Sequence, residues 1–272
     1  MRSLVLFVLV MFAGCGTSAQ SDVPPAAPPA EAAGPSLQTP GATDEADVAD
    51  GPTTAEVVIV ENAAIQAFGG SVASDGTVNL NNSTITDEGL SSLKTVPNLK
   101  YLFLDSTQIS NAGLAELEGL NGLETLNLGD TKISGDGLAH IKDLDRLEKL
   151  WLDNTPITDA DLQYVSGLSN IWWLKLGGTQ INGPGLKHLK PLKKLKWLHL
   201  RDTQVQDGDL KHLVGLGMLE ELDLHNTKVS DAGIEHLKQL PNLERLTITE
   251  TQITDAGVQQ LKSALPDCYV DR

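Results

Sequence analysis

Cysteine is scarce in this chain, and its scarcity excludes two kinds of architecture. Only Cys15 and Cys268 occur among 272 residues, which is too few for a disulfide framework and gives no Cys pair at a metal-site spacing. The sequence also lacks a phosphate-binding glycine loop, a serine nucleophile elbow and a pair of catalytic carboxylates. We therefore expect no catalytic residues, no metal and no cofactor.

Basic residues are absent from a long N-terminal stretch. No Lys or Arg lies between Arg2 and Lys94, and the whole chain has a formal net charge of −16. An acidic surface repels phosphate backbones, so this balance argues against nucleic acid as a partner. Within the stretch, residues 16–54 are rich in Pro, Ala and Gly and poor in large apolar side chains. Such a segment buries too little to fold, and we expect a disordered tether.

Long apolar runs are missing as well. Residues 4–12 are apolar and follow Arg2, but the run is too short to span a bilayer as a mature helix and has the layout of a secretory signal. It ends in Phe12–Ala13–Gly14–Cys15, which resembles the lipobox of bacterial lipoproteins. The resemblance implies acylation of Cys15, with palmitate among the acyl chains. It also implies anchoring in the cell envelope, at the outer membrane or cell surface rather than the inner membrane. An ordinary cleaved signal is the alternative.

One repeat dominates the remainder of the chain. Seven units of 24 residues begin at Leu99 and follow one another without insertion. Their consensus is LxxLxLxxTxIxDxGLxxLxxLxx, and every apolar place holds Leu, Ile or Val except at Ala264. Alternating apolar residues predict a half-buried strand, and leucines three apart predict the inner face of a helix. Units of this kind stack into a solenoid.

This pattern resembles the leucine-rich repeat family over roughly residues 75–272. The resemblance implies an α/β solenoid shaped as a horseshoe or arc, with a parallel sheet on the concave side and helices on the convex side. Threonine replaces the family's usual Asn in the ninth place, from Thr107 to Thr251. We expect its hydroxyl to satisfy buried backbone groups of the turn. The variant looks like repeats of planctomycete-type bacterial proteins and is similar to those of F-box adaptors.

The expected organisation has five parts. A signal peptide spans 1–14, the lipidated Cys and tether span 15–54, an N-terminal cap with a degenerate first repeat spans 55–98, the seven repeats span 99–266, and a capping strand spans 267–272. A glycine in the fifteenth place of most units should let the turns pack closely, and Asp161 and Asp209 depart from that rule. Cys268 is expected to be a structural residue of the C-terminal cap.

Aromatic residues make up only 4% of the chain, yet Trp172 and Trp173 are adjacent. The third, fifth and seventh places of each unit should face the concave side. This puts Trp173 beside Trp197 and diagonal to Trp151, with Trp172 at the rim. Trp, Tyr and Arg dominate interface hot spots. We therefore predict that the concave face binds a partner through Tyr101, Phe103, Lys149, Trp151, Trp173, Lys175, Trp197, His199 and Arg201.

Other polar patterns suggest chemistry that their geometry disfavours. His199, Asp223 and Thr247 fall on consecutive strands, but the acid would then lie between base and nucleophile, which is the wrong order for a triad. Four histidines share one convex place, where neighbouring segments are too far apart for a zinc site. The lysines between residues 187 and 196 are interpreted as a solvated face, with a surface for an anionic partner as the alternative. The convex histidines are His140, His188, His212 and His236.

The sequence thus predicts a lipid-anchored, non-enzymatic module that binds a protein or peptide on its concave sheet. The partner class follows from the resemblance, since leucine-rich repeats mostly bind proteins. Two alternatives remain: a structural envelope protein that contacts cell-wall glycan without a discrete ligand, and an adaptor similar to the repeat part of F-box proteins. Packing within the sheet would also account for the tryptophans, because aromatic cross-strand pairs stabilise sheets.

Overall fold

The computed structural model describes residues 62–272, which belong to one compact unit spanning Thr54–Arg272. The expected signal peptide, the lipidation site at Cys15 and the tether lie outside the described residues. The first part of the expected N-terminal cap, residues 55–61, lies outside them too. No described helix is long and apolar enough to cross a membrane.

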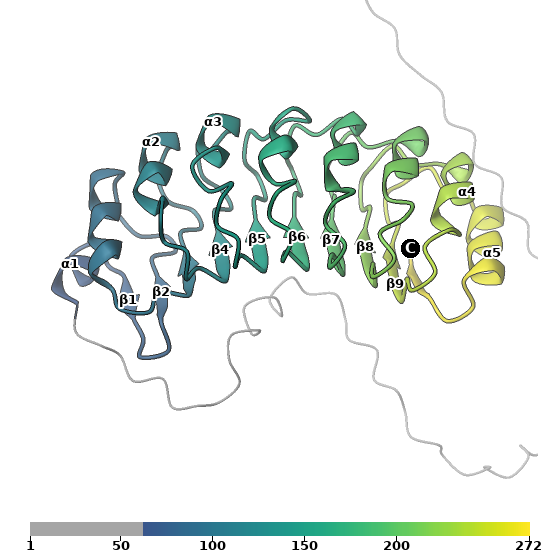
Figure 1. Cartoon of the computed structure of the whole chain (residues 1–272). Coiled ribbons are helices and arrows are strands. Elements are labelled where there is room, and N and C mark those ends of the chain that lie inside the picture. Colours follow the sequence, from purple (N-terminus) through teal and green to yellow (C-terminus); the bar gives the residue numbers. More distant parts are fainter. Residues whose placement is uncertain (1–61) are drawn as a thin grey trace, which may run out of the picture. The chain divides into compact units, whose positions relative to one another are not determined.

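Ten short strands form one sheet in which each strand pairs with the next along the chain (Figure 1). β1 and β2 are antiparallel, and the later pairs are parallel. The register advances by one repeat at each step, so that Leu126 lies opposite both Leu102 and Leu150. The strands are β1 Ser71–Val72, β2 Thr77–Asn79, β3 Tyr101–Phe103, β4 Thr125–Asn127, β5 Lys149–Trp151, β6 Trp173–Lys175, β7 Trp197–His199, β8 Glu221–Asp223, β9 Arg245–Thr247 and β10 Tyr269–Asp271.

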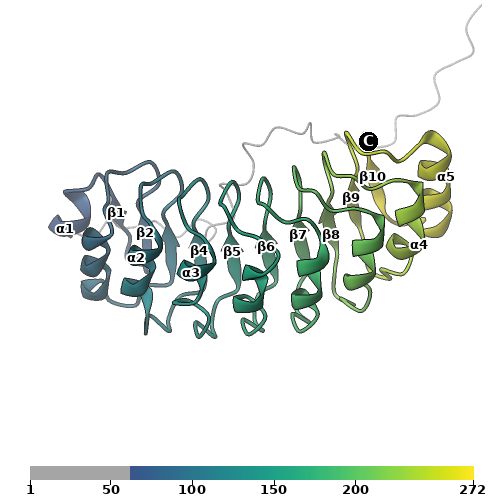
Figure 2. The ribbon, with the colours of Figure 1, turned by 90° about the horizontal axis from the view of Figure 1, so that it is seen from above.

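Short helical segments form a second layer on the other face of this sheet (Figures 1 and 2). The α-helical segments are α1 Ala63–Gln66, α2 Asn111–Leu114, α3 Gly135–Leu138, α4 Ile234–Leu237 and α5 Asp255–Ala264. The 3₁₀ segments are η2 Glu88–Thr95, η3 Ala115–Leu117, η4 Asp161–Tyr164, η5 Pro184–Leu189, η6 Asp207–His212 and η7 Asp231–Gly233. The ends of this unit bend toward the strands, which places the sheet on the concave side (Figure 1). The predicted solenoid class is confirmed.

The convex layer differs from the expected row of α-helices, because much of it is 3₁₀ helix and the α-helices before α5 are four residues long. The leucine spacing explains the difference. Leu186, Leu189 and Leu192 are three residues apart and fully buried, which matches the 3.0 residues per turn of a 3₁₀ helix better than the 3.6 of an α-helix. A tight 3₁₀ turn therefore keeps the whole row on the core side.

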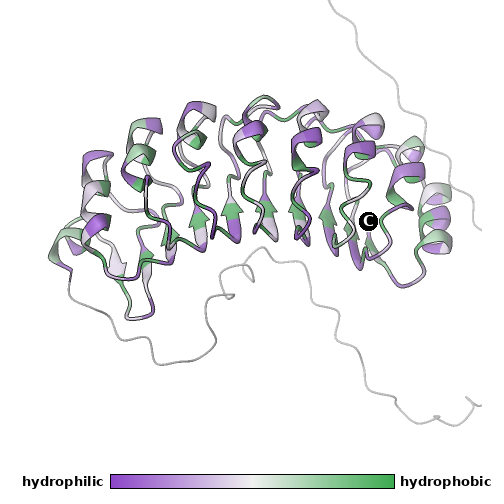
Figure 3. Cartoon of the chain, viewed as in Figure 1, coloured by the Kyte–Doolittle hydropathy of each residue, from purple (hydrophilic) through white to green (hydrophobic). Residues whose placement is uncertain are grey.

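A continuous apolar core fills the space between the two layers. The central residue of each strand from β3 to β9 is a leucine with 0% exposure, and hydrophobic residues recur in each strand in Figure 3. Burying one such side chain contributes about 1.5–3 kcal/mol. The repeated leucines therefore fix which residues of each strand face inward, and with them which residues face the concave surface.

The threonines of the ninth place stabilise the turn after each strand. Each hydroxyl donates to the carbonyl oxygen three residues earlier, as in Thr107 to Leu104 at 2.7 Å and Thr203 to Leu200 at 2.6 Å. The same bond forms in the other five units. Threonine thus satisfies buried backbone, as expected, but each bond stays within its own turn.

Carboxylate and amide side chains in the thirteenth place join neighbouring repeats. Asp207 accepts hydrogen bonds from the backbone N–H and the hydroxyl of Ser230 in the next unit, both at 2.7 Å. Asp231 holds Thr254 in the same way, at 2.8 and 2.7 Å. The fifteenth-place glycine of the next unit lies directly beneath this side chain; at Gly233, an added Cβ would lie 2.9 Å from Asp207. The glycine is therefore needed because the neighbouring carboxylate occupies its side-chain space.

Asp161 and Asp209 depart from the glycine rule for a reason visible in the preceding unit. Where the fifteenth place is Asp, the thirteenth place of the unit before it is Gly135 or Gly183. Asp161 accepts from the N–H and hydroxyl of Thr158, at 2.8 and 2.7 Å. A Cβ on Gly135 would collide with the Asp161 carboxylate, and one on Gly183 with that of Asp209. The carboxylate therefore occupies the same place but comes from the other side of the repeat boundary.

The two ends of the sheet are covered differently. At the N-terminal end, α1 and the β1–β2 hairpin place Ile65 in the core, fully buried. At the C-terminal end, β10 pairs with β9 and Val270 lies opposite Leu246.

Cys268 precedes β10 with 8% exposure, and burial raises the pKa of its thiol to about 11. Because the thiolate is the reactive form, this cysteine is a structural residue rather than a nucleophile at neutral pH.

Candidate functional site

The concave face carries an aromatic cluster, which we define as Phe103, Trp151, Trp172, Trp173 and Trp197. The sheet register places Trp173 of β6 opposite Trp197 of β7, as the repeat spacing predicts. The ring centroids of Trp173 and Trp197 are 4.8 Å apart and those of Trp151 and Trp173 are 5.0 Å apart, both in edge-to-face arrangements. Phe103 adjoins Trp151 at 6.1 Å. Such pairs contribute about 0.5–1.5 kcal/mol each beyond their buried area.

Trp173 lies at the bottom of the aromatic cluster rather than on its surface. Its exposure is only 2%, because the rings of Trp151, Trp172 and Trp197 surround it. It points out of the leucine core, as the register requires, but it is covered from the concave side. The sequence placed Trp173 among the residues that touch a partner; its burial instead makes it the support for rings that remain half-exposed.

Two lysines complete the cluster. The Nζ atom of Lys149 lies 4.8 Å from the ring centroid of Trp172 and 5.3 Å from that of Trp173. The Nζ atom of Lys175 lies 5.0 Å from the ring of Trp151 and 4.9 Å from that of Trp173. Cation–π contacts of this kind contribute about 0.5–2 kcal/mol, more as they lose water. The two ammonium groups therefore place positive charge over the rings of the aromatic cluster.

Some indole N–H groups in the cluster lack hydrogen-bond partners. The Nε1 atoms of Trp151 and Trp173 are buried and bond to no other described residue. An unpaired buried donor costs about 1–3 kcal/mol. By contrast, Trp172 donates from Nε1 to the carboxylate of Glu148 at 3.2 Å. The cluster is therefore not arranged for the lowest packing energy, which is the pattern expected when residues serve another purpose.

The remaining predicted residues lie around this cluster. Tyr101 belongs to β3, where burial and a hydrogen bond with Glu124 raise the pKa of its phenol. His199 lies 6.2 Å from the Trp173 ring and has its Nε2 atom 3.2 Å from Glu221. Arg201 passes over Gly177, where an added Cβ would lie 2.6 Å from the arginine Cγ. The site thus continues from β3 to the turn after β7.

Asp153 is a buried acid that the sequence prediction did not include. Its Oδ1 atom accepts the N–H of Gly177 at 2.8 Å. Burial raises its pKa, while the positive charges of Lys175, His199 and Arg201 oppose that rise. The carboxylate therefore lies close enough to these basic groups to interact with their charges beside the tryptophans. Its seventh place, in a column that also contains Asp105, was the available sequence signal.

No group of three His, Cys, Asp or Glu side chains in residues 62–272 is placed to hold a metal ion. His225 bonds to Thr249 through Nδ1 at 2.6 Å. On the convex side, His140 bonds to Glu118 at 2.5 Å, and burial lowers the pKa of His212.

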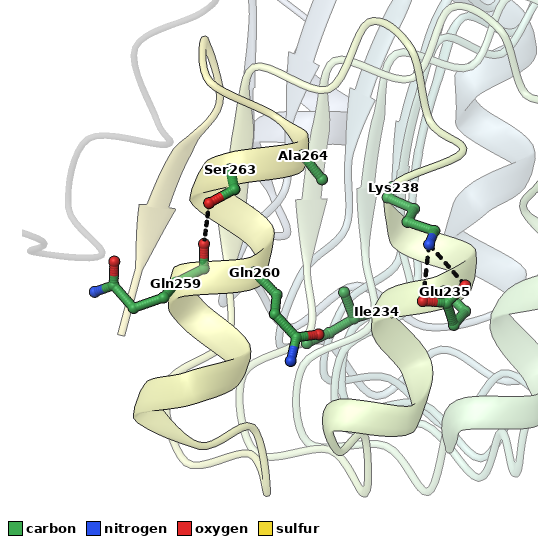
Figure 4. Close-up of a pocket in the computed structure, with 7 residues that line it drawn as sticks. All are labelled: Ile234, Glu235, Lys238, Gln259, Gln260, Ser263 and Ala264. Atoms are coloured by element: carbon green, nitrogen blue, oxygen red, sulfur yellow. Dashed lines mark hydrogen bonds and ion pairs between the residues drawn. The ribbon is translucent and has the colours of Figure 1, made fainter.

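A shallow hollow of about 480 Å³ lies between α4 and α5 on the convex side (Figure 4). Three of its polar side chains have partners: Lys238 pairs with Glu235 at 2.7 Å, and the hydroxyl of Ser263 donates to the carbonyl of Gln259 at 2.8 Å. The other side chains drawn are neutral and aim into solvent or toward the neighbouring helix. Nothing in this hollow resembles a reactive or ligand-binding centre.

Comparison with known proteins agrees with this geometry. A sequence profile described as a leucine-rich repeat matches residues 77–94. The crystal structure of an internalin C2 from Listeria monocytogenes is 30% identical with a TM-score of 0.55, covering 72% of this chain and 79% of that one. An internalin from the same organism is 24% identical with a TM-score of 0.56, covering 71% of this chain and 52% of that one. The latter likeness supports the fold alone.

A search of curated protein sequences gives no match, so the assignment rests on the repeat, the structure and the solved relatives. The strand register, the buried leucine columns and the similarity to internalin C2 agree with one another. The chain belongs to the leucine-rich repeat family.

Proposed function

We propose that the solenoid formed by all the repeats is a non-enzymatic module that binds a protein or peptide on its concave sheet. The observation that carries this proposal is the aromatic cluster with Lys149 and Lys175 over its rings. Leucine-rich repeat proteins typically bind proteins, and Trp, Tyr and Arg are enriched among the few residues that carry most of the binding energy at interfaces. Because the rings already pack against one another, little side-chain entropy is lost on binding.

The lysines favour a peptide over a glycan. Sugars stack on open ring faces, whereas Lys149 and Lys175 lie over faces of Trp151, Trp172 and Trp173. A protein partner can place a carboxylate near these ammonium groups while its apolar side chains contact the ring edges. A structural role in contact with the cell wall is therefore the second candidate. Binding to insoluble cell wall distinguishes the two.

We also propose that Cys15 carries a lipid that anchors the chain in the cell envelope, as the lipobox-like Phe12–Ala13–Gly14–Cys15 suggests. Two or more acyl chains on one residue give stable membrane attachment. A chain with Cys15→Ser should move from the detergent phase to the aqueous phase of a Triton X-114 partition and should lose incorporation of labelled palmitate. Wild type that stays aqueous and unlabelled would refute the anchor and leave the binding module untouched.

The binding proposal is tested with a variant built from residues that the repeats already use. Phe103→Thr with Trp151→Asn places in the fifth column the residues found at Thr247 and Asn127 and leaves the buried Trp173 in place. Each lost hot spot costs more than about 1 kcal/mol, so capture of an envelope protein should weaken at least tenfold. Lys142→Asn on the exposed convex side is the matched control.

Equal capture by the wild type, the concave variant and the control would refute concave binding, provided circular dichroism shows that all three are folded. Sedimentation of the wild type with purified cell wall, unchanged in the concave variant, would instead support the structural role.

A further inference from the structure

Two polar columns of the repeat are interrupted at the same place. The second place of each unit is charged in six repeats but is Trp172 in the fourth. The last place holds polar or small residues or proline, except at Met218, which ends the fifth unit. Both columns lie at the edge where the strands begin. The charged residues of the second place are Lys100, Glu124, Glu148, Lys196, Glu220 and Glu244.

Each interruption replaces a stabilising interaction made elsewhere. In the last place, Asn170 and Asn242 donate to backbone carbonyls of the preceding unit at 2.6 and 2.5 Å, a bond that a methionine cannot make. In the second place, Lys100 pairs with Glu124 at 2.9 Å across neighbouring strands, whereas Trp172 replaces the ion pair by donating from its neutral Nε1 atom to Glu148 at 3.2 Å. Met218 therefore gives up a link between repeats, whereas Trp172 keeps one and adds an aromatic ring at this edge.

The two side chains line one hollow, which we call the edge hollow. It has a volume of about 510 Å³ and is lined by Trp172, Lys194, Lys196, Trp197, Met218 and Glu220. Met218 is 45% exposed and, with Tyr269, is one of two large hydrophobic side chains exposed among residues 62–272. Trp172 and Trp197 meet edge to face, 5.2 Å apart. Two indole rings and a flexible thioether thus form the walls of a recess that fits an inserted apolar side chain.

Lysines surround the edge hollow. The ammonium group of Lys194 bonds to the neutral amide oxygen of Asn170 at 2.6 Å. Lys196 pairs with Glu220 at 2.7 Å, and the neighbouring Lys193 donates to the carbonyl of Gly215 at 3.1 Å. Three lysines at this edge thus face two carboxylates, Glu220 and the Glu148 that bonds to Trp172, in a chain with a net charge of −16. Charge complementarity therefore favours an acidic partner.

We propose that the edge hollow binds an acidic peptide segment of a partner protein. One apolar side chain of the segment enters between Trp172, Trp197 and Met218, and flanking carboxylates reach Lys194 and Lys196. The inference rests on the proposed protein-binding function, but it adds a second anchor outside the concave face. A recess accepts an inserted side chain, whereas attachment to a bilayer would require apolar side chains that protrude.

The test uses a random peptide library that is displayed on phage and selected on the immobilised full-length protein. Selected peptides are synthesised with a fluorophore, and their affinity is measured by fluorescence polarisation. The two variants, Met218→Asn and Lys194→Asn, each introduce the residue that the last place of the repeat already has at Asn170 and Asn242. Met218→Asn can restore the bond to the preceding unit, so we expect it to fold and to melt no lower than the wild type.

We expect the selected peptides to carry Asp or Glu beside a Leu, Ile or Phe. Each edge variant should weaken their binding at least tenfold, and 0.5 M salt should weaken binding to the wild type. Peptides without acidic enrichment, or peptides that bind the edge variants as well as the wild type, would overturn the proposal. Loss only in the Phe103→Thr/Trp151→Asn variant would support the concave module while refuting the edge hollow.

Vesicles of phosphatidylglycerol are tested in parallel. Vesicle binding that Met218→Asn abolishes, with no acidic peptide selected, would assign the edge to a membrane and refute the peptide.

Discussion

The exchange of Gly and Asp across a repeat boundary gives a sharp test of how the units are joined. In Asp161→Gly, the N–H and hydroxyl of Thr158 lose the carboxylate that accepts from them at 2.8 and 2.7 Å. Hydrogen bonds to charged groups contribute about 1.5–3 kcal/mol each. Because Asp161 is half-buried, we expect the pair of bonds to be worth about 2–3 kcal/mol in total. In Gly135→Asp, two carboxylates would compete for one place, which destabilises by a similar amount.

The double variant Gly135→Asp/Asp161→Gly should recover most of this loss. It recreates the arrangement of Asp207 beneath Ser230, in which the carboxylate comes from the preceding unit. The expected coupling energy is therefore about 3–5 kcal/mol, above the usual range of about 0.5–3 kcal/mol for residues in contact, because each single variant disturbs the same carboxylate place. Each single variant should lower the melting temperature by roughly 4–12 °C, since 1 kcal/mol corresponds to about 2–4 °C in a domain of this size.

The four proteins are compared by urea unfolding, followed by circular dichroism and by tryptophan fluorescence. The two signals are needed because long repeat arrays do not always unfold in one step. Asp209→Gly is the matched single variant, because Asp209 occupies the same place two units later; its partner Gly183 has a φ of 115°, which strains any other residue there. A single variant as stable as the wild type, or a double variant less stable than both singles, would refute the shared carboxylate place.

Four further outcomes follow from the structure. Glu250→Asn should raise stability by about 0.5–1 kcal/mol in urea unfolding, because Glu250 has a left-handed φ of 56° that Asn tolerates better; no gain would contradict this. Thr179→Val should cost about 1–3 kcal/mol, because the buried carbonyl of Leu176 loses its donor at 2.7 Å; a neutral result would show that the turn bonds are dispensable. In a Cys15→Ser chain, Cys268 should resist Ellman's reagent at pH 8 until urea is added, since burial raises its pKa to about 11; rapid native labelling would refute its burial. Asn226 holds the pKa of Asp202 below the usual 3.8 through a 2.8 Å bond. This adds stability above the unfolded-state pKa that is lost as pH falls through the folded-state pKa. Asn226→Ala should therefore raise the Asp202 pKa measured by NMR, and an unchanged value would dismiss the bond.

Much of the fold follows from the sequence because the repeat fixes the register. The 24-residue spacing alone predicts that Trp173 lies beside Trp197, and the structure confirms that pairing. The extent of the convex helices does not follow so directly. Leucines three apart suit a 3₁₀ turn, yet the same letters are read as an α-helical stripe when only the family resemblance is considered.

The site is harder to predict, because side-chain coverage depends on neighbouring strands. Column position shows that Trp173 faces the concave side, but not that Trp151, Trp172 and Trp197 would reduce its exposure to 2%. Met218 and Trp172 belong to different columns of the repeat, so neither column alone indicates the edge hollow. Asp161 departs from the glycine rule of its own column, and its reason lies at Gly135 in the preceding unit.

The Gly and Asp exchange limits how such a chain can lengthen. If the unit with Gly135 were copied alone, its new junction would have no carboxylate; if the unit with Asp161 were copied alone, its new junction would have two. Copying both units together leaves every junction with one, and the same exchange recurs two units on at Gly183 and Asp209. An insertion made from the units with Gly135 and Asp161 therefore has to be a tandem pair, whereas the unit with Asp231 and Gly233 can be copied alone because its new junction would again hold one carboxylate.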